Sequence, residues 1–288
     1  MKLLRYVWNG VPRVGVVKGD GIVDIQALHP QFTQMRDIVF GGSQAVAEIE
    51  RSLANASPSL QLSGATLLAP IEKPGKYLAI GLNYRKHAEE SAQLGVVSKP
   101  QQLWFNKQTT CISGPYDVID PGVTEKLDYE VEIAFVIGSR ARYVAEADAH
   151  KHIAGYTICN DVSERYWQKD RKGQWVKGKS FETSGPVGPW IVTADEIPDV
   201  HALAMTLDVN GQRRQNGTTA NMIFKIPFLL HYVTQFMVLE PGDIVTTGTP
   251  AGVALGMTPP VWLKAGDELT LAIDHLGVQR QTVVPFAM

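Results

Sequence analysis

The sequence predicts a mostly β protein of the α+β class, and three observations support this class. Short apolar segments alternate with polar residues at a period of two, which is the period of a strand. Glycine and proline separate these segments, and few stretches show helical periodicity. A chain of 288 residues with 44% hydrophobic content can bury a substantial core. We therefore expect a small N-terminal α+β module, residues 1–68, followed by a larger β-rich domain, residues 69–288.

The elements of the N-terminal module are expected to be strands at residues 11–17 and 21–25 and a helix at residues 43–53. A serine-rich stretch, followed by Pro70 and Pro74, marks the boundary to the main domain. In that domain we expect a helix at residues 222–235, a type I′ turn at the Asn210-Gly211 pair, and strands at residues 187–192, 205–209, 242–246, 268–273 and 277–284.

Charge and composition exclude several classes of partner. The formal net charge is -2 and no long basic run occurs, so the sequence does not indicate nucleic acid or an anionic membrane as a partner. No run of about 18 apolar residues occurs, and the first residues lead directly into strand-like sequence, so we expect a cytoplasmic protein. Cys111 and Cys159 lack metal-finger spacing and are expected to be buried free thiols.

The segment from residue 127 to residue 137 alternates acids with large apolar side chains. As one strand it would place Asp128, Glu130 and Glu132 on the same face, with residues two apart separated by roughly 6.6 Å at the backbone. Carboxylates this close repel one another unless a cation lies between them. The alternative is a half-solvated edge strand whose acidic face meets water.

A second predicted strand, residues 153–161, ends on Asp161. An acid at the end of a buried strand is where a third oxygen ligand is expected. Three carboxylates suit Mg²⁺ or Mn²⁺ better than Zn²⁺. The sequence therefore predicts that Glu130, Glu132 and Asp161 form one divalent-metal site.

His87 and Glu90 lie three residues apart in a segment that follows a predicted strand. This spacing places two side chains on one face of a helical turn. A carboxylate beside an imidazole orients it and supports its charged form, which is how a general base that activates water is usually built. A surface pair is the alternative, and the spacing alone does not separate the two.

Motifs along residues 67–288 resemble, in order, those of the fumarylacetoacetate hydrolase family. They are Gly81-Leu82-Asn83-Tyr84 with His87 and Glu90, Asp128-Tyr129-Glu130-Val131-Glu132, Asn160-Asp161-Val162-Ser163 with Arg165 and Gln168, Gly178-Lys179-Ser180-Phe181, and Gly242-Asp243 with Thr247-Gly248-Thr249-Pro250-Ala251-Gly252. The resemblance implies a catalytic domain built as a mixed β-sandwich roll. It also implies a homodimer and a divalent cation, with Mg²⁺ expected first and Mn²⁺ or Ca²⁺ as alternatives.

The same resemblance implies a role for each candidate site residue. It assigns the metal-ligand role to Glu130, Glu132 and Asp161. It assigns catalytic roles to His87, Glu90 and Lys179, and substrate contacts to Gln168 and Thr249. His87 with Glu90 would activate water, and Lys179 would offset a developing oxyanion. Residues 85–110 and 166–178 would select the substrate, and residues 85–100 are expected to close over it as a lid.

The expected substrate is a small 2-oxo acid held by the cation. Attack of water at C4 would cleave the C3–C4 bond of a 2,4-dioxo acid, such as an acylpyruvate, fumarylpyruvate or a sugar-derived 2,4-dioxo-3-deoxy acid. The products would be pyruvate or a related 2-oxo acid and a carboxylic acid. An oxaloacetate-type decarboxylase and a 2-hydroxydienoate isomerase pass through the same enolate and stay open. A metal-dependent sugar-acid binding protein without catalysis is the alternative from another class.

Overall fold

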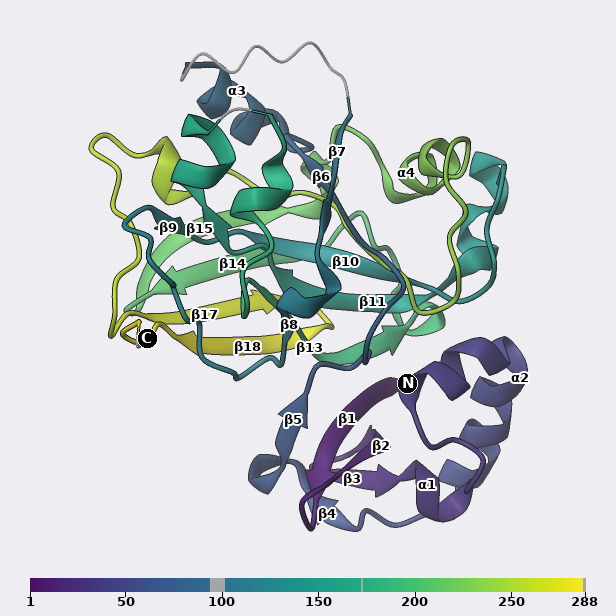
Figure 1. Cartoon of the computed structure of the whole chain (residues 1–288). Helices are drawn as coiled ribbons and strands as arrows, with labels where there is room; N and C mark the ends of the chain where they lie inside the picture. The colour runs from purple at the N-terminus through teal and green to yellow at the C-terminus, as the bar shows by residue number, and fades with distance from the viewer. Residues whose placement is uncertain (94–101, 172, 287–288) are drawn as a thin grey trace.

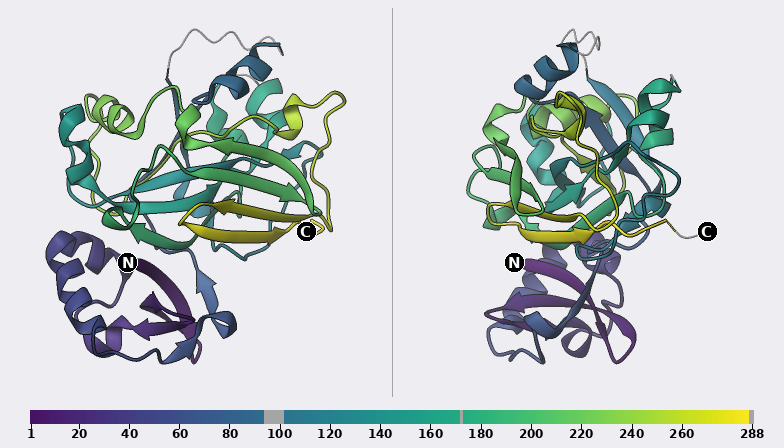
Figure 2. Two further views of the ribbon diagram at one scale, coloured as in Figure 1. Left: turned by 180° about the vertical axis from the view of Figure 1, so that it is seen from behind. Right: turned by 90° about the vertical axis from the view of Figure 1, so that its left-hand side faces the viewer.

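A computed structural model of the chain describes residues 1–93, 102–171 and 173–286, and it is mostly β as expected (Figure 1). The first strands and helices form a compact unit on one side of the larger body, and both views in Figure 2 show the same arrangement. Within the described ranges, no helix has the combined length and hydropathy that a membrane span requires.

The N-terminal module consists of five strands and two helices. They are β1 (Lys2–Trp8), β2 (Val11–Lys18), β3 (Gly21–Asp24), α1 (Ile25–Leu28), α2 (Met35–Leu53), β4 (Leu60–Gln61) and β5 (Thr66–Leu68). Strand β1 pairs with β13 of the main body, with Leu3 opposite Ile191. The sheet is therefore continuous across the sequence boundary, and the division into two domains at residue 68 stays a prediction.

Helix α2 begins at Met35, so a first helical segment that was not expected precedes the expected helix at residues 43–53, which is present as the second segment. Gly42 has a φ of +56° and joins two helical segments across a kink, which interrupts the apolar periodicity. The first segment is capped because Asp37 accepts the backbone amide of Gln34 at 2.8 Å. The helix buries Met35, Ile38, Val39, Ala45 and Ile49.

Together with the strands of the N-terminal module, the remaining strands build one large sheet, one four-stranded sheet and one two-stranded sheet. The large sheet has the order β4-β3-β2-β1-β13-β11-β10-β16-β6-β7, and the four-stranded sheet has the order β15-β14-β17-β18. The strands are β6 (Tyr77–Gly81), β7 (Leu103–Lys107), β8 (Ile112–Ser113), β9 (Leu127–Asp128), β10 (Val131–Ile137), β11 (Ile153–Asn160), β12 (Ser163–Glu164), β13 (Gly185–Thr193), β14 (Ala204–Val209), β15 (Gln212–Thr218), β16 (Ile244–Thr246), β17 (Glu268–Ile273) and β18 (Gly277–Thr282).

Helices fill the connections between these strands. They are α3 (Arg85–Gln93), α4 (Ile226–Val233), the π-helical turn η4 (Tyr166–Asp170), and the 3₁₀ turns η1 (Leu62–Gly64), η2 (Thr109–Cys111), η3 (Glu146–His152), η5 (Trp175–Gly178), η6 (Ala194–Glu196), η7 (Thr219–Asn221) and η8 (Ala254–Gly256). Helix α4 is shorter than the expected helix at residues 222–235, because Pro227 lies in its first turn and residues 219–221 form a separate 3₁₀ turn.

The centre of the large sheet is buried on both faces. Strand β10 pairs with β11 on one side and β16 on the other, and all seven of its residues are buried. Ile133 and Phe135 pack into one hydrophobic cluster, whereas Ala134 and Val136 pack into a second one. The alternative of a half-solvated edge strand is therefore wrong.

The acid-bearing segment is not one continuous strand, which corrects the expectation for residues 127–137. Strand β9 ends at Asp128 and β10 begins at Val131, so Tyr129 and Glu130 lie between strands. In contrast, the expected hairpin turn is confirmed. Asn210 and Gly211 have φ values of +52° and +74°, the two positive angles of a type I′ turn, and they join β14 to β15.

Replacing Gly155 with alanine should destabilise the central sheet. The added Cβ atom would lie 2.2 Å from the Val192 carbonyl oxygen on β13, and that backbone cannot yield without breaking the ladder. We expect the variant to lose about 1–3 kcal/mol of unfolding free energy, measured by urea denaturation. Gly64→Ala is the control, because its Cβ would meet no atom within 4 Å. Equal stability of the two variants would contradict this packing.

Candidate metal centre and active-site cavity

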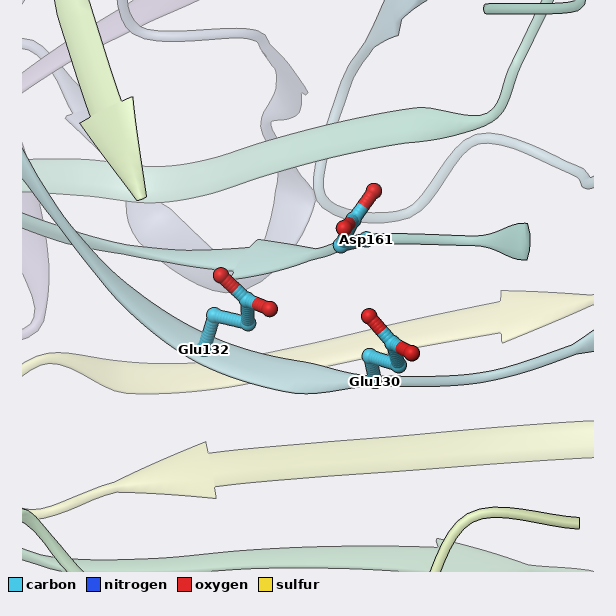
Figure 3. Close-up of side chains that lie close together, drawn as sticks. All are labelled: Glu130, Glu132 and Asp161. Carbon is cyan, nitrogen blue, oxygen red and sulfur yellow. The ribbon is translucent and has the colours of Figure 1, made fainter. Parts of the chain in front are cut away.

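Three buried carboxylates meet where one central strand begins and its neighbour ends. Glu130 immediately precedes β10, Glu132 lies within it, and Asp161 immediately follows β11. The two strands are antiparallel with Val131 opposite Asn160, so the start of one lies beside the end of the other. One oxygen atom of each carboxylate lies within 4.8 Å of the other two (Figure 3). The expected proximity of the three acids is thus present, and their role as ligands stays a prediction.

The chemistry of this carboxylate cluster fits a hard divalent cation. Burial raises the pKa of Glu132 well above its usual range, and repulsion from Asp161 and Glu130 adds to the effect. Burial also opposes ionisation of Glu130, but the charges of Lys179 and Arg165 outweigh burial and lower the pKa of Glu130 to about 2. A divalent cation would favour the ionised form of Glu132, and carboxylate oxygens are ligands that Mg²⁺, Mn²⁺ and Ca²⁺ prefer.

Two buried lysines hold the Asp161 carboxylate from its two oxygens. Lys179 Nζ donates to Asp161 Oδ2 at 2.6 Å and to Glu130 Oε2 at 2.8 Å. Lys107 Nζ donates to Asp161 Oδ1 at 2.7 Å and to the Ser184 carbonyl at 2.9 Å. Each carboxylate oxygen has two lone pairs, so these bonds are compatible with ligation of a metal by the same groups. The Lys179 ammonium also keeps a third proton beyond the two donated here.

Arg165 joins the carboxylate cluster to Asp128 and Gln168. Its guanidinium donates to Asp128 Oδ2 at 2.9 Å, to Glu130 Oε1 at 2.6 Å and to Gln168 Oε1 at 2.8 Å. Because arginine only donates, the Gln168 amide is fixed with its oxygen toward Arg165, and its NH₂ group stays available to another acceptor. Asp128 also accepts the backbone amides of Ala254 and Leu255, at 2.8 and 3.0 Å, so it faces η8 and not the carboxylate cluster.

His87 and Glu90 lie one turn apart on α3. His87 Nδ1 is 3.5 Å from Glu90 Oε2, which is within ion-pair range. The geometry is too loose for a hydrogen bond, and Nδ1 has no hydrogen-bond partner among the described residues. His87 is buried, while Glu90 is partly exposed and accepts the Gly252 amide at 3.4 Å. A simple surface pair does not describe a buried imidazole, and catalytic contacts of this kind often tighten only when substrate binds.

A cavity of about 280 Å³ brings the candidate residues together. Its polar lining includes Glu130, Glu132, Asp161, His87, Gln168, Lys179 and Thr249, and its apolar lining includes Ile80, Leu82, Phe105, Trp175 and Leu255. Glu90 is the one candidate outside the lining. Thr249 Oγ1 donates to the Val131 carbonyl and accepts from Gln215 Nε2, so its hydroxyl proton is committed within the protein. The backbone amide is therefore the better candidate contact of Thr249.

Two buried cations of this site, Lys107 and Arg165, were not predicted from the sequence. Lys107 follows Leu103 and Phe105 at a period of two on β7, so a lysine on an otherwise apolar strand face was the available signal. Arg165 was part of a motif but was not separable from an ordinary solvated arginine. Its burial at 4% exposure and its three acceptors give it a structural role in the cavity wall.

Two further expectations concern the thiols and the lid. Cys111 and Cys159 are free and buried, as predicted, and burial raises the pKa of both thiols, so neither is poised as a nucleophile. Tyr84 of the first motif is buried, and its hydroxyl donates to Met205 Sδ at 3.3 Å. The part of the expected lid at residues 94–100 lies outside the described residues.

Comparisons with known proteins agree on one family. The family model described as fumarylacetoacetate (FAA) hydrolase C-terminal matches residues 76–284. A protein of Burkholderia multivorans with the provisional name of a hydrolase is 44% identical over 284 residues, covering 98% of each chain. The crystal structure of maleylpyruvate hydrolase from Sphingobium sp. SYK-6, in complex with manganese(II) ion and pyruvate, is similar with a TM-score of 0.82 and 31% identity over 100% of both chains. The 2-hydroxyhepta-2,4-diene-1,7-dioate isomerase from Mycobacterium marinum has a TM-score of 0.78 and 29% identity, again over 100% of both chains.

Replacing Glu132 with glutamine should stabilise the metal-free protein in a pH-dependent way. A glutamate side chain ordinarily has a pKa of 4.5, and burial raises the pKa of Glu132 above this value in the folded state. Above pH 4.5 the folded state therefore binds more protons than the unfolded state, and this group makes stability fall as pH rises. In EDTA, Glu132→Gln should exceed the unaltered protein in stability by more at pH 8 than at pH 5, measured by urea denaturation.

Addition of Mg²⁺ or Mn²⁺ provides the control for this prediction. Either ion should raise the melting temperature of the unaltered protein more than that of Glu132→Gln, because binding to the folded state stabilises it and the variant has lost one charged ligand. A stability difference between the two proteins that is the same at both pH values would contradict a raised pKa of Glu132 in the folded state.

Proposed function

Because this chain belongs to the fumarylacetoacetate hydrolase family, we propose that it is a hydrolase that uses a divalent cation to cleave the C3–C4 bond of a 2,4-dioxo acid. One observation carries the proposal. The buried carboxylates of Glu130, Glu132 and Asp161 line the same cavity as His87 and Lys179. The cavity is slightly smaller than the roughly 300–1,000 Å³ of sites for drug-sized ligands, which suits a small acid.

The three carboxylates are the residues that would hold the cation. When bound there, the cation supplies Lewis-acid stabilisation to negative charge on the 2-oxo and carboxylate oxygens of the substrate. Mg²⁺ is the proposed ion, with Mn²⁺ and Ca²⁺ as alternatives. The manganese and pyruvate in the Sphingobium neighbour support both the cation and the 2-oxo acid part of the proposal.

His87 is the proposed general base. It lines the cavity, and Glu90, which is not among the lining residues, lies 3.5 Å from its Nδ1 atom. The imidazole would take a proton from a water molecule as that water attacks the C4 carbonyl, and Glu90 would stabilise the imidazolium that forms. The attacking oxygen ends in the carboxylic acid product, and the proton passes to C3 of the departing 2-oxo acid.

Lys179 and Gln168 are the proposed donors to the developing oxyanion. Lys179 uses two protons on Glu130 and Asp161, which leaves a third to donate to the substrate. Gln168 has its oxygen held by Arg165, so its NH₂ group is the one that can face the substrate. Both donors are fixed before the reaction, which is the condition for electrostatic stabilisation to lower the barrier.

Isomerisation of a 2-hydroxydienoate is the second candidate function. The Mycobacterium marinum neighbour favours it, and it would use the same cavity with His87 moving a proton between carbon atoms. Decarboxylation of an oxaloacetate-like acid needs no general base to activate a water molecule.

A homodimer and a cytoplasmic location stay expectations from the sequence.

The deciding experiment supplies one substrate for each reaction. We would incubate the purified protein and Mg²⁺ with acetylpyruvate, fumarylpyruvate, oxaloacetate and a 2-hydroxydienoate, and follow ultraviolet absorbance together with the product acids. Release of pyruvate from a dioxo acid is the expected result. Turnover of only the dienoate or only oxaloacetate would replace the proposal with an isomerase or a decarboxylase. Tight binding without any product would favour a binding protein.

Replacing His87 with alanine should lower turnover by about 10²-fold or more, because a positioned general base contributes roughly that factor. The measurement is kcat for the dioxo acid that the unaltered protein cleaves. His150→Ala is the control, because His150 is exposed and does not line the cavity. Unchanged turnover of His87→Ala, with the same Mg²⁺-dependent rise in melting temperature, would remove His87 from the mechanism.

A further inference from the structure

The cations that line the cavity differ in how they are paired. Three of the lining residues are Arg165, Lys179 and Lys169. Arg165 and Lys179 are each bonded to two carboxylates, at N···O distances of 2.6–2.8 Å. Lys169, by contrast, has no carboxylate within 4 Å in the part of the chain that the structure describes. It is the lining cation that is left for a ligand.

The acids nearest to Lys169 along the chain are engaged elsewhere. Asp170 pairs with Lys126 at 2.7 Å. Glu164 accepts the backbone amides of Tyr166 and Trp167 at 3.2 and 2.6 Å. Lys169 is half-buried, and burial and repulsion from Arg165 lower its pKa, outweighing the attraction of Asp170, which lies beyond ion-pair distance. A partly desolvated cation with no counter-ion is unfavourable, and an anionic ligand would relieve this cost.

The net charge of the cavity lining also favours an anionic ligand. Three acids, Glu130, Glu132 and Asp161, face three cations, so the ionised lining has a net charge of 3 − 3 = 0. Behind the lining, the charges of Asp128 and Lys107 also cancel. Glu90 is outside the lining. A divalent cation on the three acids would give the cavity an excess of about two positive charges, and a monocarboxylic acid would neutralise only one of them.

The same cavity lining contains the carboxylate cluster, a further charged residue and apolar side chains. Lys169 follows Gln168 in η4, and both residues line the cavity. The rings of Phe105 and Trp175, with centroids 5.4 Å apart, belong to the same lining and offer apolar contacts to a carbon chain. The lining thus offers an oxygen-rich cation site, apolar walls and one free ammonium group.

We propose that Lys169 binds a second, distal carboxylate and makes the protein selective for dicarboxylic over monocarboxylic 2,4-dioxo acids. The inference rests on the proposed function, because it takes the first carboxylate and the 2-oxo group to be held at the carboxylate cluster. It adds the class of substrate and names a residue that selects it.

The test uses two ligands that the protein cannot cleave. 2-Oxoadipate and 2-oxohexanoate share a six-carbon 2-oxo acid chain and lack a 4-oxo group, and they differ in having a carboxylate or a methyl group at the far end. Their dissociation constants in Mg²⁺ would be measured by titration calorimetry. We expect the unaltered protein to bind the dicarboxylate about fivefold more tightly, the effect of one partly exposed ion pair.

The variants isolate the charge of residue 169. Lys169→Met should lose the preference for 2-oxoadipate, whereas Lys169→Arg should keep most of it because the charge is retained. Lys151→Met is the control, since Lys151 is an exposed lysine outside the cavity, and it should bind both acids as the unaltered protein does. Thermal unfolding of each variant would confirm that it is folded.

Equal affinity of the unaltered protein for the two acids, or a full preference retained by Lys169→Met, would overturn the inference. These outcomes are separate from failure of the proposed function. A preference that depends on Lys169, in a protein that cleaves no dioxo acid, would support the role of Lys169 and overturn the hydrolase. Cleavage of dioxo acids without such a preference would support the hydrolase and overturn the role of Lys169.

Discussion

The structure of the site depends on one interaction, the bridge that the Lys179 ammonium makes between Glu130 and Asp161. It holds two carboxylates of the cluster in a region where both side chains are buried. Buried ion pairs give little net stability, because the cost of removing both charges from water offsets most of their attraction. The bridge is therefore better explained by what it positions than by what it adds to folding. Glu132 accepts the Gly248 amide, and its pKa is raised by burial and by repulsion from Asp161 and Glu130.

Such a cluster needs a rigid support, and the central strands provide it. Both faces of β10 are covered by apolar side chains. Its pairing with β11 fixes the distance between Glu132 and Asp161, the residue that follows β11. Lys107 reaches the same point from β7, four strands away from β11 in the order of the sheet. A shift of any of these strands by one residue would turn the charged side chains to the opposite face. The apolar cores thus determine the geometry of the polar site.

The sequence was informative where the physical cause is local. A period of two predicted strands, the Asn210-Gly211 pair predicted its turn, and the alternation of acids with apolar residues predicted a carboxylate cluster. It was less informative where the cause is long-range. The ion pair between Lys107 and Asp161 spans 54 residues and follows from sheet order, which no periodicity reveals. The interruption at Tyr129 and Glu130 arises because Asp128 is drawn toward Arg165 and the amides of η8. Lys169 had no local signal, since its distinction is the absence of a partner among the described residues.

The arrangement of donors explains why hydrolysis and isomerisation are close alternatives in one cavity. In the proposed mechanism Lys179 and Gln168 would stabilise negative charge on oxygen, which both reactions develop, so neither residue would discriminate between them. The proposed difference arises at His87, which would either activate a water or move a proton between carbon atoms of the substrate. Its Nδ1 atom has an ion-pair contact at 3.5 Å and no hydrogen bond, so the ring is held by packing more than by Glu90. Space for one water beside the imidazole, when a substrate fills the cavity, would therefore decide which of the two reactions this site performs.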